Sequence, residues 1–135
     1  MKTLLKLEES AQFVFCAFVL LVMDVPWWVY ALLVIGPDVG MLGYLINSRV
    51  GALTYNIVHH KGMAILVGAL GVLAGSMSVH APEMRDLDDV LYIAGLILYG
   101  HASMDRIFGY GLKFGDNFHH THLGWIGKGA SKAER

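Results

Sequence analysis

The chain has 135 residues, enough for one domain, and 56% of them are hydrophobic, more than is usual in a soluble protein. Its formal net charge is -1, from 10 Lys and Arg against 11 Asp and Glu, so no basic surface for nucleic acid is expected. The single cysteine, Cys16, excludes a disulfide within the chain. The composition therefore favours a small membrane protein.

Four long blocks of the sequence are almost free of charge: residues 4–23, 26–46, 51–75 and 90–108. Each is long enough to cross a bilayer, since about 20 helical residues span the hydrocarbon core. The first block carries Glu8 where a signal peptide would be basic, so we expect it to remain attached. The sequence predicts an all-α integral membrane four-helix bundle over residues 1–124, followed by a polar tail, 125–135. The alternative, a soluble four-helix protein, would need more polar positions on each helix.

Positive charge predicts the orientation of these helices. Lys2 and Lys6 precede the first block, Arg49 separates the second from the third, and Lys113 and Lys128 follow the fourth. The connection between the third and fourth blocks instead has one arginine against four acidic residues. By the positive-inside rule, both termini are expected in the cytoplasm.

Ionisable residues inside the blocks are few, and such groups normally face the bundle interior as partners or functional groups. The main ones are Glu8, Asp38, His59, His60, His101 and Asp105. At about 1.5 Å per helical residue, all of them fall in one layer, roughly 5 to 15 Å below the inner surface. Lys61 lies in the same region and is expected to pair with one of the buried acids. All four helices therefore bring acids or imidazoles to the same depth.

Spacing within the blocks narrows the candidate site. His101 and Asp105 are four residues apart, and Asn56 and His59 three apart, so each pair shares one helix face. Pro37 precedes Asp38 in a glycine-flanked stretch, so we expect the second block to kink beside that carboxylate.

A segment with several glycines follows Phe108 and leads to His119, His120 and His122. We expect this segment to fold back over the cytoplasmic mouth of the bundle and add one or more ligands. Imidazole and carboxylate ligands without thiolates suit zinc, iron or manganese, as one or two divalent ions.

Several sequence strings carry a resemblance to a known family. They are "LLKLE" from Leu4, "PDVGMLGYL" from Pro37, "RVGALTYNIVH" from Arg49, and "HASMDRIFGYGLKF" from His101 running on to "THLG". In this order they resemble the bacterial four-span membrane family catalogued as domain of unknown function 4260. The resemblance implies a multi-pass protein of the bacterial inner membrane without an assigned activity. The family pattern matches here at Glu8, Asp38, Asn56, His59, His101, Asp105, Arg106, Tyr110, Lys113 and His122, and it leaves out His60, His119 and His120.

Together these residues predict a metal-dependent hydrolase acting on an amphiphilic or lipid-like substrate. The expected metal ligands are His59, His101, Asp105 and His122. Asp38 or Glu8 is the expected general base, acting on a metal-bound water. Arg106, Lys113 and Asn56 are the expected substrate-binding residues.

The sequence is also compatible with other functions. A dinuclear iron oxidoreductase would use the same residues, with Glu8 and Asp38 as bridging ligands, and a transporter would use them as proton or cation relays. In a purely structural membrane protein, Asp38 would be held by Tyr44, Tyr55 or Asn56, and Glu8 would pair with a neighbouring lysine. Membrane lipid is the expected partner, and assembly as a homo-oligomer is compatible with each reading.

Overall fold

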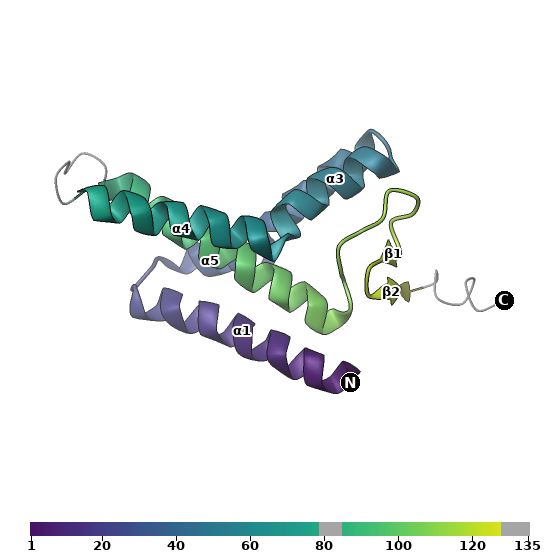
Figure 1. Ribbon diagram of the computed structural model, residues 1–135, viewed down its shortest axis with the longest axis horizontal. Helices are drawn as coiled ribbons and strands as arrows, with labels where there is room; N and C mark the ends of the chain where they lie inside the picture. The colour runs from purple at the N-terminus through teal and green to yellow at the C-terminus, as the bar shows by residue number, and fades with distance from the viewer. Residues whose placement is uncertain (79–84, 128–135) are drawn as a thin grey trace.

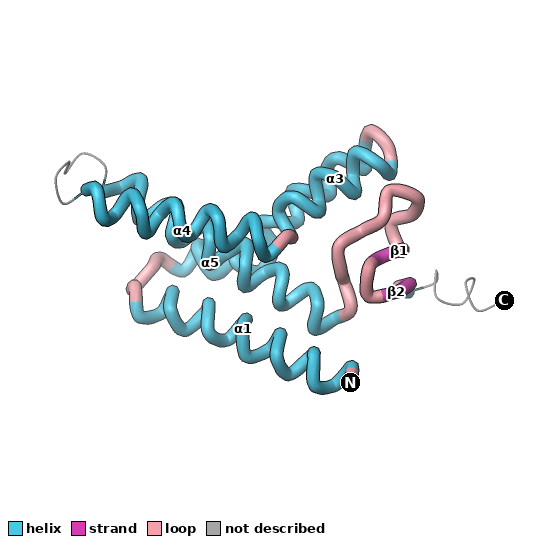
Figure 2. The backbone as a smooth tube through the Cα atoms, viewed as in Figure 1, coloured by secondary structure: helices cyan, strands magenta, loops and turns pink. Residues whose placement is uncertain are grey.

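The computed structural model describes residues 1–78 and 85–127. Within them the chain forms five α-helices and one 3-10 helix, η1: α1 (Lys2–Val22), α2 (Trp27–Ile35), η1 (Gly36–Leu45), α3 (Ser48–His59), α4 (Lys61–Ser78) and α5 (Arg85–Phe108). A short antiparallel hairpin of β1 (His120–Thr121) and β2 (Gly124–Trp125) follows. Figures 1 and 2 show α1 and α4 on either side of α5, and both helices pack against it. The predicted all-α class is confirmed.

The second predicted block combines two kinds of helix. The α-helix α2 ends at Ile35, and the 3-10 helix begins at Gly36, directly before Pro37. Proline has no N–H to donate and its ring obstructs the preceding turn, so an α-helix cannot continue unchanged through it. The break expected beside Asp38 is therefore present. The whole segment, Trp27–Leu45, is the one helix in the described residues that is long and apolar enough to cross a membrane.

The third predicted block is not one helix, contrary to the sequence prediction. The helix α3 ends at His59, α4 begins at Lys61, and the two are bent by 46°. Between them, His60 has an extended backbone, and its carbonyl accepts hydrogen bonds from the N–H groups of Met63 and Ala64. His60 thus ends one helix and begins the next. The pair is long and apolar enough to cross a membrane only if both halves count as one broken span.

In the described part of the chain, the two remaining long helices, α1 and α5, lack an apolar stretch that is long enough and sufficiently free of charge to cross a membrane. Each carries charge inside its predicted block, at Glu8 and Glu9 in α1 and at Asp105 and Arg106 in α5. One or two candidate spans are therefore found in residues 1–78 and 85–127. The four-span arrangement and the cytoplasmic termini remain predictions. Of the predicted polar tail, Trp125 belongs to β2, and residues 128–135 lie outside the described part.

The apolar residues of the fold lie mostly on its surface. A small core forms around Leu20, Val29 and Leu33, whereas large side chains such as Phe15, Phe18 and Val72 are more than half exposed. Soluble proteins rarely expose large contiguous apolar patches, and such patches mark surfaces that contact a membrane or another protein.

The helices α4 and α5 approach closely at Gly68 and Gly95. A Cβ atom added at Gly95 would lie 2.6 Å from the Gly68 Cα and backbone N, whereas a Cβ at Gly68 would lie 3.8 Å from the Gly95 Cα. The first distance is impossible without moving backbone, and the second is an ordinary contact. The two glycines therefore play unequal roles, although both lie at the same crossing.

This asymmetry predicts different effects of the same substitution at the two positions. Gly95→Ala is expected to lower the free energy of unfolding by about 2 kcal/mol or more, because the helices must separate. Gly68→Ala is expected to be neutral or stabilising by up to about 1 kcal/mol, because alanine favours a helix more than glycine does. Thermal unfolding of the two detergent-solubilised variants measures the difference, and equal effects would contradict this packing.

Candidate metal centre

Four acidic and imidazole side chains meet beside α5. Asp38 comes from η1, His59 from the last turn of α3, and His101 and Asp105 from one face of α5. One donor atom from each residue lies within 4.8 Å of the donor atoms of the other three. The i,i+4 spacing of His101 and Asp105 explains their shared face. The break at Pro37 brings Asp38 into a 3-10 helix that packs against α3.

Both histidines of this cluster are oriented through their Nδ1 atoms. The Nδ1 of His59 lies 2.9 Å from the carbonyl oxygen of Tyr55, and the Nδ1 of His101 lies 3.1 Å from that of Leu33. A carbonyl oxygen can only accept, so each Nδ1 carries a proton and the neutral ring has a free lone pair on Nε2. Both Nε2 atoms are buried and have no hydrogen-bond partner. This is how histidine is typically held when its other nitrogen binds a metal ion.

The spacing of the donor atoms fits a shared ion better than direct hydrogen bonds. The Nε2 of His59 is 3.3 Å from Asp105 Oδ2 and 3.7 Å from Asp38 Oδ1. The Nε2 of His101 is 3.4 Å from Asp38 Oδ1 and 3.8 Å from Asp105 Oδ1. N–H···O hydrogen bonds are usually about 2.7 to 3.2 Å long. Two ligands bound tetrahedrally at about 2.1 Å from one zinc ion are separated by about 3.4 Å.

Tyr55 supports the cluster from α3, a role that the sequence analysis missed. Its hydroxyl donates a hydrogen bond to the Asp105 carboxylate, and its ring stacks on His59 with centroids 3.7 Å apart. Tyr55 is fully buried. It precedes His59 by four residues, so helical spacing places both on one face and could have identified it. Tyr55 therefore fixes both a carboxylate and an imidazole of the cluster.

Lys113 lies close to the cluster but is not an exposed anchor for lipid. It is 3% exposed, its Nζ donates to the carbonyl of Phe118 at 3.0 Å, and the same atom lies 4.7 Å from the centre of the Tyr55 ring. Burial lowers the pKa of this ammonium group, whereas Asp105 and Asp38 act to raise the pKa. Lys113 therefore lies within electrostatic range of both carboxylates of the cluster.

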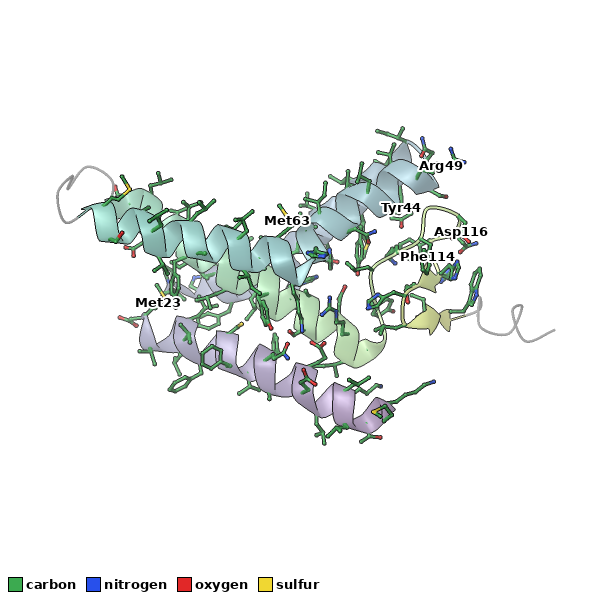
Figure 3. The ribbon with its side chains drawn as sticks, viewed as in Figure 1. Met23, Tyr44, Arg49, Met63, Phe114 and Asp116 are labelled. Carbon is green, nitrogen blue, oxygen red and sulfur yellow. The ribbon has the colours of Figure 1, made fainter. Side chains whose placement is uncertain are left out.

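Asn56 holds the segment after α5 rather than an open binding surface. Its side-chain Nδ2 donates to the Lys113 carbonyl at 2.9 Å, and the Lys113 N–H donates to its Oδ1 at 2.7 Å. Nearby, Tyr44 of η1 packs edge-on against Phe118, with ring centroids 5.1 Å apart; Figure 3 labels Tyr44 close to this segment. Both the N–H and the oxygen of the Asn56 amide, which was predicted to bind substrate, are thus hydrogen-bonded to the backbone of Lys113.

His122 lies outside the cluster, although the sequence analysis placed it among the ligands. Its Nδ1 accepts a hydrogen bond from the Leu112 N–H at 2.8 Å, so the neutral ring carries its proton on Nε2. Partial burial lowers the pKa of His122, which favours this neutral form. His122 is therefore oriented as a donor, the reverse of His59 and His101.

The remaining histidines also lie outside the cluster. His120 bonds Asp116 at 2.8 Å and stacks on Trp125, and this bond lowers the pKa of the exposed Asp116 carboxyl. His60 is exposed at the bend between α3 and α4. None of the three histidines outside the family pattern belongs to the metal-binding group found in the described residues.

On α1 the inward-facing acid is Glu9 rather than the predicted Glu8. Glu8 is exposed and accepts a hydrogen bond from Gln12. Glu9 forms an ion pair with Lys61, and one of its carboxylate oxygens lies 3.6 Å from Arg106 Nη1. The expected pairing of Lys61 with an acid is confirmed. This network joins α1 to α4 and α5, and Glu8 does not belong to the metal cluster.

The fold and this cluster define a class: a small helical protein with a buried His/Asp group that can hold a metal ion and with at least one apolar segment long enough to span a membrane. The chain belongs to the family described as Domain of unknown function (DUF4260), whose model matches residues 2–126. The resemblance noted from the sequence is therefore confirmed. No curated protein and no solved structure matches the chain.

Proposed function

We propose that the protein is an integral membrane metalloenzyme that binds one zinc ion and hydrolyses an amphiphilic substrate. The observation that carries the proposal is the pair of buried Nε2 atoms of His59 and His101. Both are unpaired, and both face carboxylates at distances suited to a shared tetrahedral ion. Without an ion, two buried acceptors would remain unsatisfied, which is unfavourable in a protein interior.

A single ion is favoured over a dinuclear centre. The dinuclear alternative needs Glu8 as a second bridging carboxylate, but Glu8 is exposed and bonds Gln12. The four donors of the cluster match the coordination number that zinc prefers. Two imidazoles with carboxylates are also a ligand set found in zinc hydrolases.

The four donors have unequal roles in this proposal. His59, His101 and Asp105 are the firm ligands, because each is also held by a second group. Asp38 is 39% exposed, against 13% for Asp105, so it is the carboxylate of the cluster that water reaches most easily. A bound zinc ion would supply a water with a lowered pKa, and Asp38 would be the carboxylate placed to accept the proton of that water.

The amphiphilic nature of the substrate follows from the surroundings. Most of the large apolar side chains on α1 and α4 are exposed, which suits contact with lipid chains. The apolar segment Trp27–Leu45 carries Asp38 itself, so the cluster belongs to a segment proposed to lie in the bilayer. A substrate with an apolar tail can reach such a site from within the membrane.

The test combines elemental analysis with an esterase assay on the full-length protein in detergent. We expect about one zinc ion per chain, and hydrolysis of a long-chain p-nitrophenyl ester that stops after chelation and returns with added zinc. Asp38→Asn should retain most of the metal and lose most of the hydrolysis. A protein without stoichiometric metal contradicts the metal centre, and a metal-loaded protein without hydrolysis contradicts the reaction.

A further inference from the structure

A second site is built where the start of α1, the end of α5 and the β1–β2 hairpin come together. Figure 1 shows these three parts at the same end of the molecule. They enclose a cavity of about 310 Å³, lined on its polar side by Lys2, Lys6, Glu9, Arg106 and His122. These residues are separate from the His/Asp cluster.

The charges of this cavity are unbalanced. Three cationic side chains face one carboxylate, and that carboxylate, Glu9, is already shared by Arg106 and Lys61. Within residues 1–78 and 85–127, neither Lys2 nor Lys6 forms an ion pair with an acid. The cavity therefore has an excess of positive charge and attracts an anion.

His122 adds an oriented donor to these charges. Because its Nδ1 accepts from the Leu112 N–H, its proton is on Nε2. The ring is held by close packing, since a Cβ atom at Gly111 would lie 2.6 Å from it. The turn that returns the chain toward α1 begins at Gly109, whose φ of 89° favours glycine. His122 thus lines the same cavity as Lys2, Lys6 and Arg106, and its neutral ring has one N–H group to donate.

Apolar residues line the other side of the cavity, among them Leu5, Trp125 and Ile126. Tryptophan and lysine are both common at the level of lipid headgroups, where an apolar ring meets a charged surface. Clusters of lysine and arginine beside a membrane segment bind anionic headgroups. Arginine, lysine and a histidine donor together are the groups that bind phosphate oxygens.

We propose that this cavity binds a phosphate group, held by Lys2, Lys6, Arg106 and His122, and that the adjoining apolar residues contact the lipid tail that carries it. The ligand class is a lipid with an exposed phosphate monoester, and the same donors would accept free phosphate. The site does not depend on the metal centre, because none of its donors belongs to the His/Asp cluster.

In the test, dihexanoyl phosphatidic acid is titrated into the full-length protein in uncharged detergent, and binding is measured by calorimetry. Lys2→Gln/Lys6→Gln is expected to weaken binding about 30-fold, because each lysine near a headgroup contributes a factor of about five. His122→Asn is expected to weaken binding about fivefold. Asparagine can replace the Nδ1 acceptor for Leu112 but removes the Nε2 donor. Arg106 is left intact because it also pairs with Glu9.

Arg49→Gln is the matched control. Arg49 is exposed at the start of α3, does not line the cavity, and its loss also removes one positive charge. Binding should stay within about twofold of the unaltered protein. Inorganic phosphate that binds at least tenfold more weakly than the lipid identifies a headgroup site, whereas equal affinities identify a site for free phosphate.

Three results would overturn the proposal: no binding of either probe, unchanged binding by Lys2→Gln/Lys6→Gln, or an equal loss in Arg49→Gln. Unchanged binding by His122→Asn would show that His122 does not contribute to binding. Zinc content is measured on the same samples. The lysine variants should keep the zinc content of the unaltered protein, so failure of the phosphate site is distinguishable from failure of the metal centre.

Discussion

Replacing His101 with asparagine is expected to reduce metal affinity on the order of 100-fold or more while leaving the protein folded. Loss of outer-shell partners alone typically lowers affinity about 10- to 100-fold, and here a ligand itself is removed. Asparagine is the informative replacement because its side-chain amide can donate to the Leu33 carbonyl in place of Nδ1–H. Only the Nε2 lone pair is lost. The bound zinc per chain, measured after gel filtration in metal-free buffer, should fall to below about a tenth.

His60→Asn is the matched control for this experiment. His60 directly follows the ligand His59, but its side chain is exposed and it is not part of the metal-binding group. Its replacement should leave the zinc content unchanged. Equal metal loss in the two variants would point to adventitious binding by surface histidines. Retention of zinc by His101→Asn would contradict the assignment of His101 as a ligand.

The cluster could be anticipated in part because two simple rules act on it. Hydropathy placed the acids and imidazoles at one depth in different helices, and the i,i+4 spacing put His101 and Asp105 on one face. The structure brings His59, His101, Asp105 and Asp38 together as this reasoning expected. The break in the second block was also predictable, because Pro37 excludes a regular α-helix.

The sequence predictions were wrong where the position of a residue depends on its rotation around the helix or on the direction of a turn, and not on its depth along the helix. Glu8 and Glu9 lie at almost the same depth, but successive residues differ by about 100° around a helix, so only Glu9 faces Lys61. The sequence alone does not indicate which of these two adjacent acids faces Lys61. His122 follows a turn at Gly109 whose direction the sequence does not specify, and the turn leads to α1 instead of the cluster.

The bend at His60 was missed for a related reason. His60 is neither proline nor glycine, so local propensity gives no sign that a helix ends there. The bend lets two residues that are close in the sequence face different helices. His59 faces α5 and η1, and Lys61 faces α1. These contacts come from distant parts of the chain and override the local preference.

Replacing Lys61 with methionine is expected to destabilise the protein by about 3 kcal/mol, the usual effect of removing one partner from a buried ion pair. Lys61 and Glu9 are only 14% and 16% exposed, so water cannot easily replace the lost partner. Lys61 also donates to Gln12, whose side-chain oxygen accepts from Tyr99 and Ser103 of α5. The substitution therefore affects the contacts that join α1 to both α4 and α5. Chemical unfolding in detergent measures the change.

The double variant Lys61→Met/Glu9→Gln separates the ion pair from general loss of packing. Removing both charges leaves neither group buried and unpaired, so the double variant should be more stable than the sum of the two single effects predicts, by about 1 to 3 kcal/mol. Lys6→Met is the control, since Lys6 is an exposed lysine without an ion pair in the described residues, and the change should be within about 0.5 kcal/mol. Additive effects of the Lys61 and Glu9 substitutions would mean that the two charges do not stabilise one another.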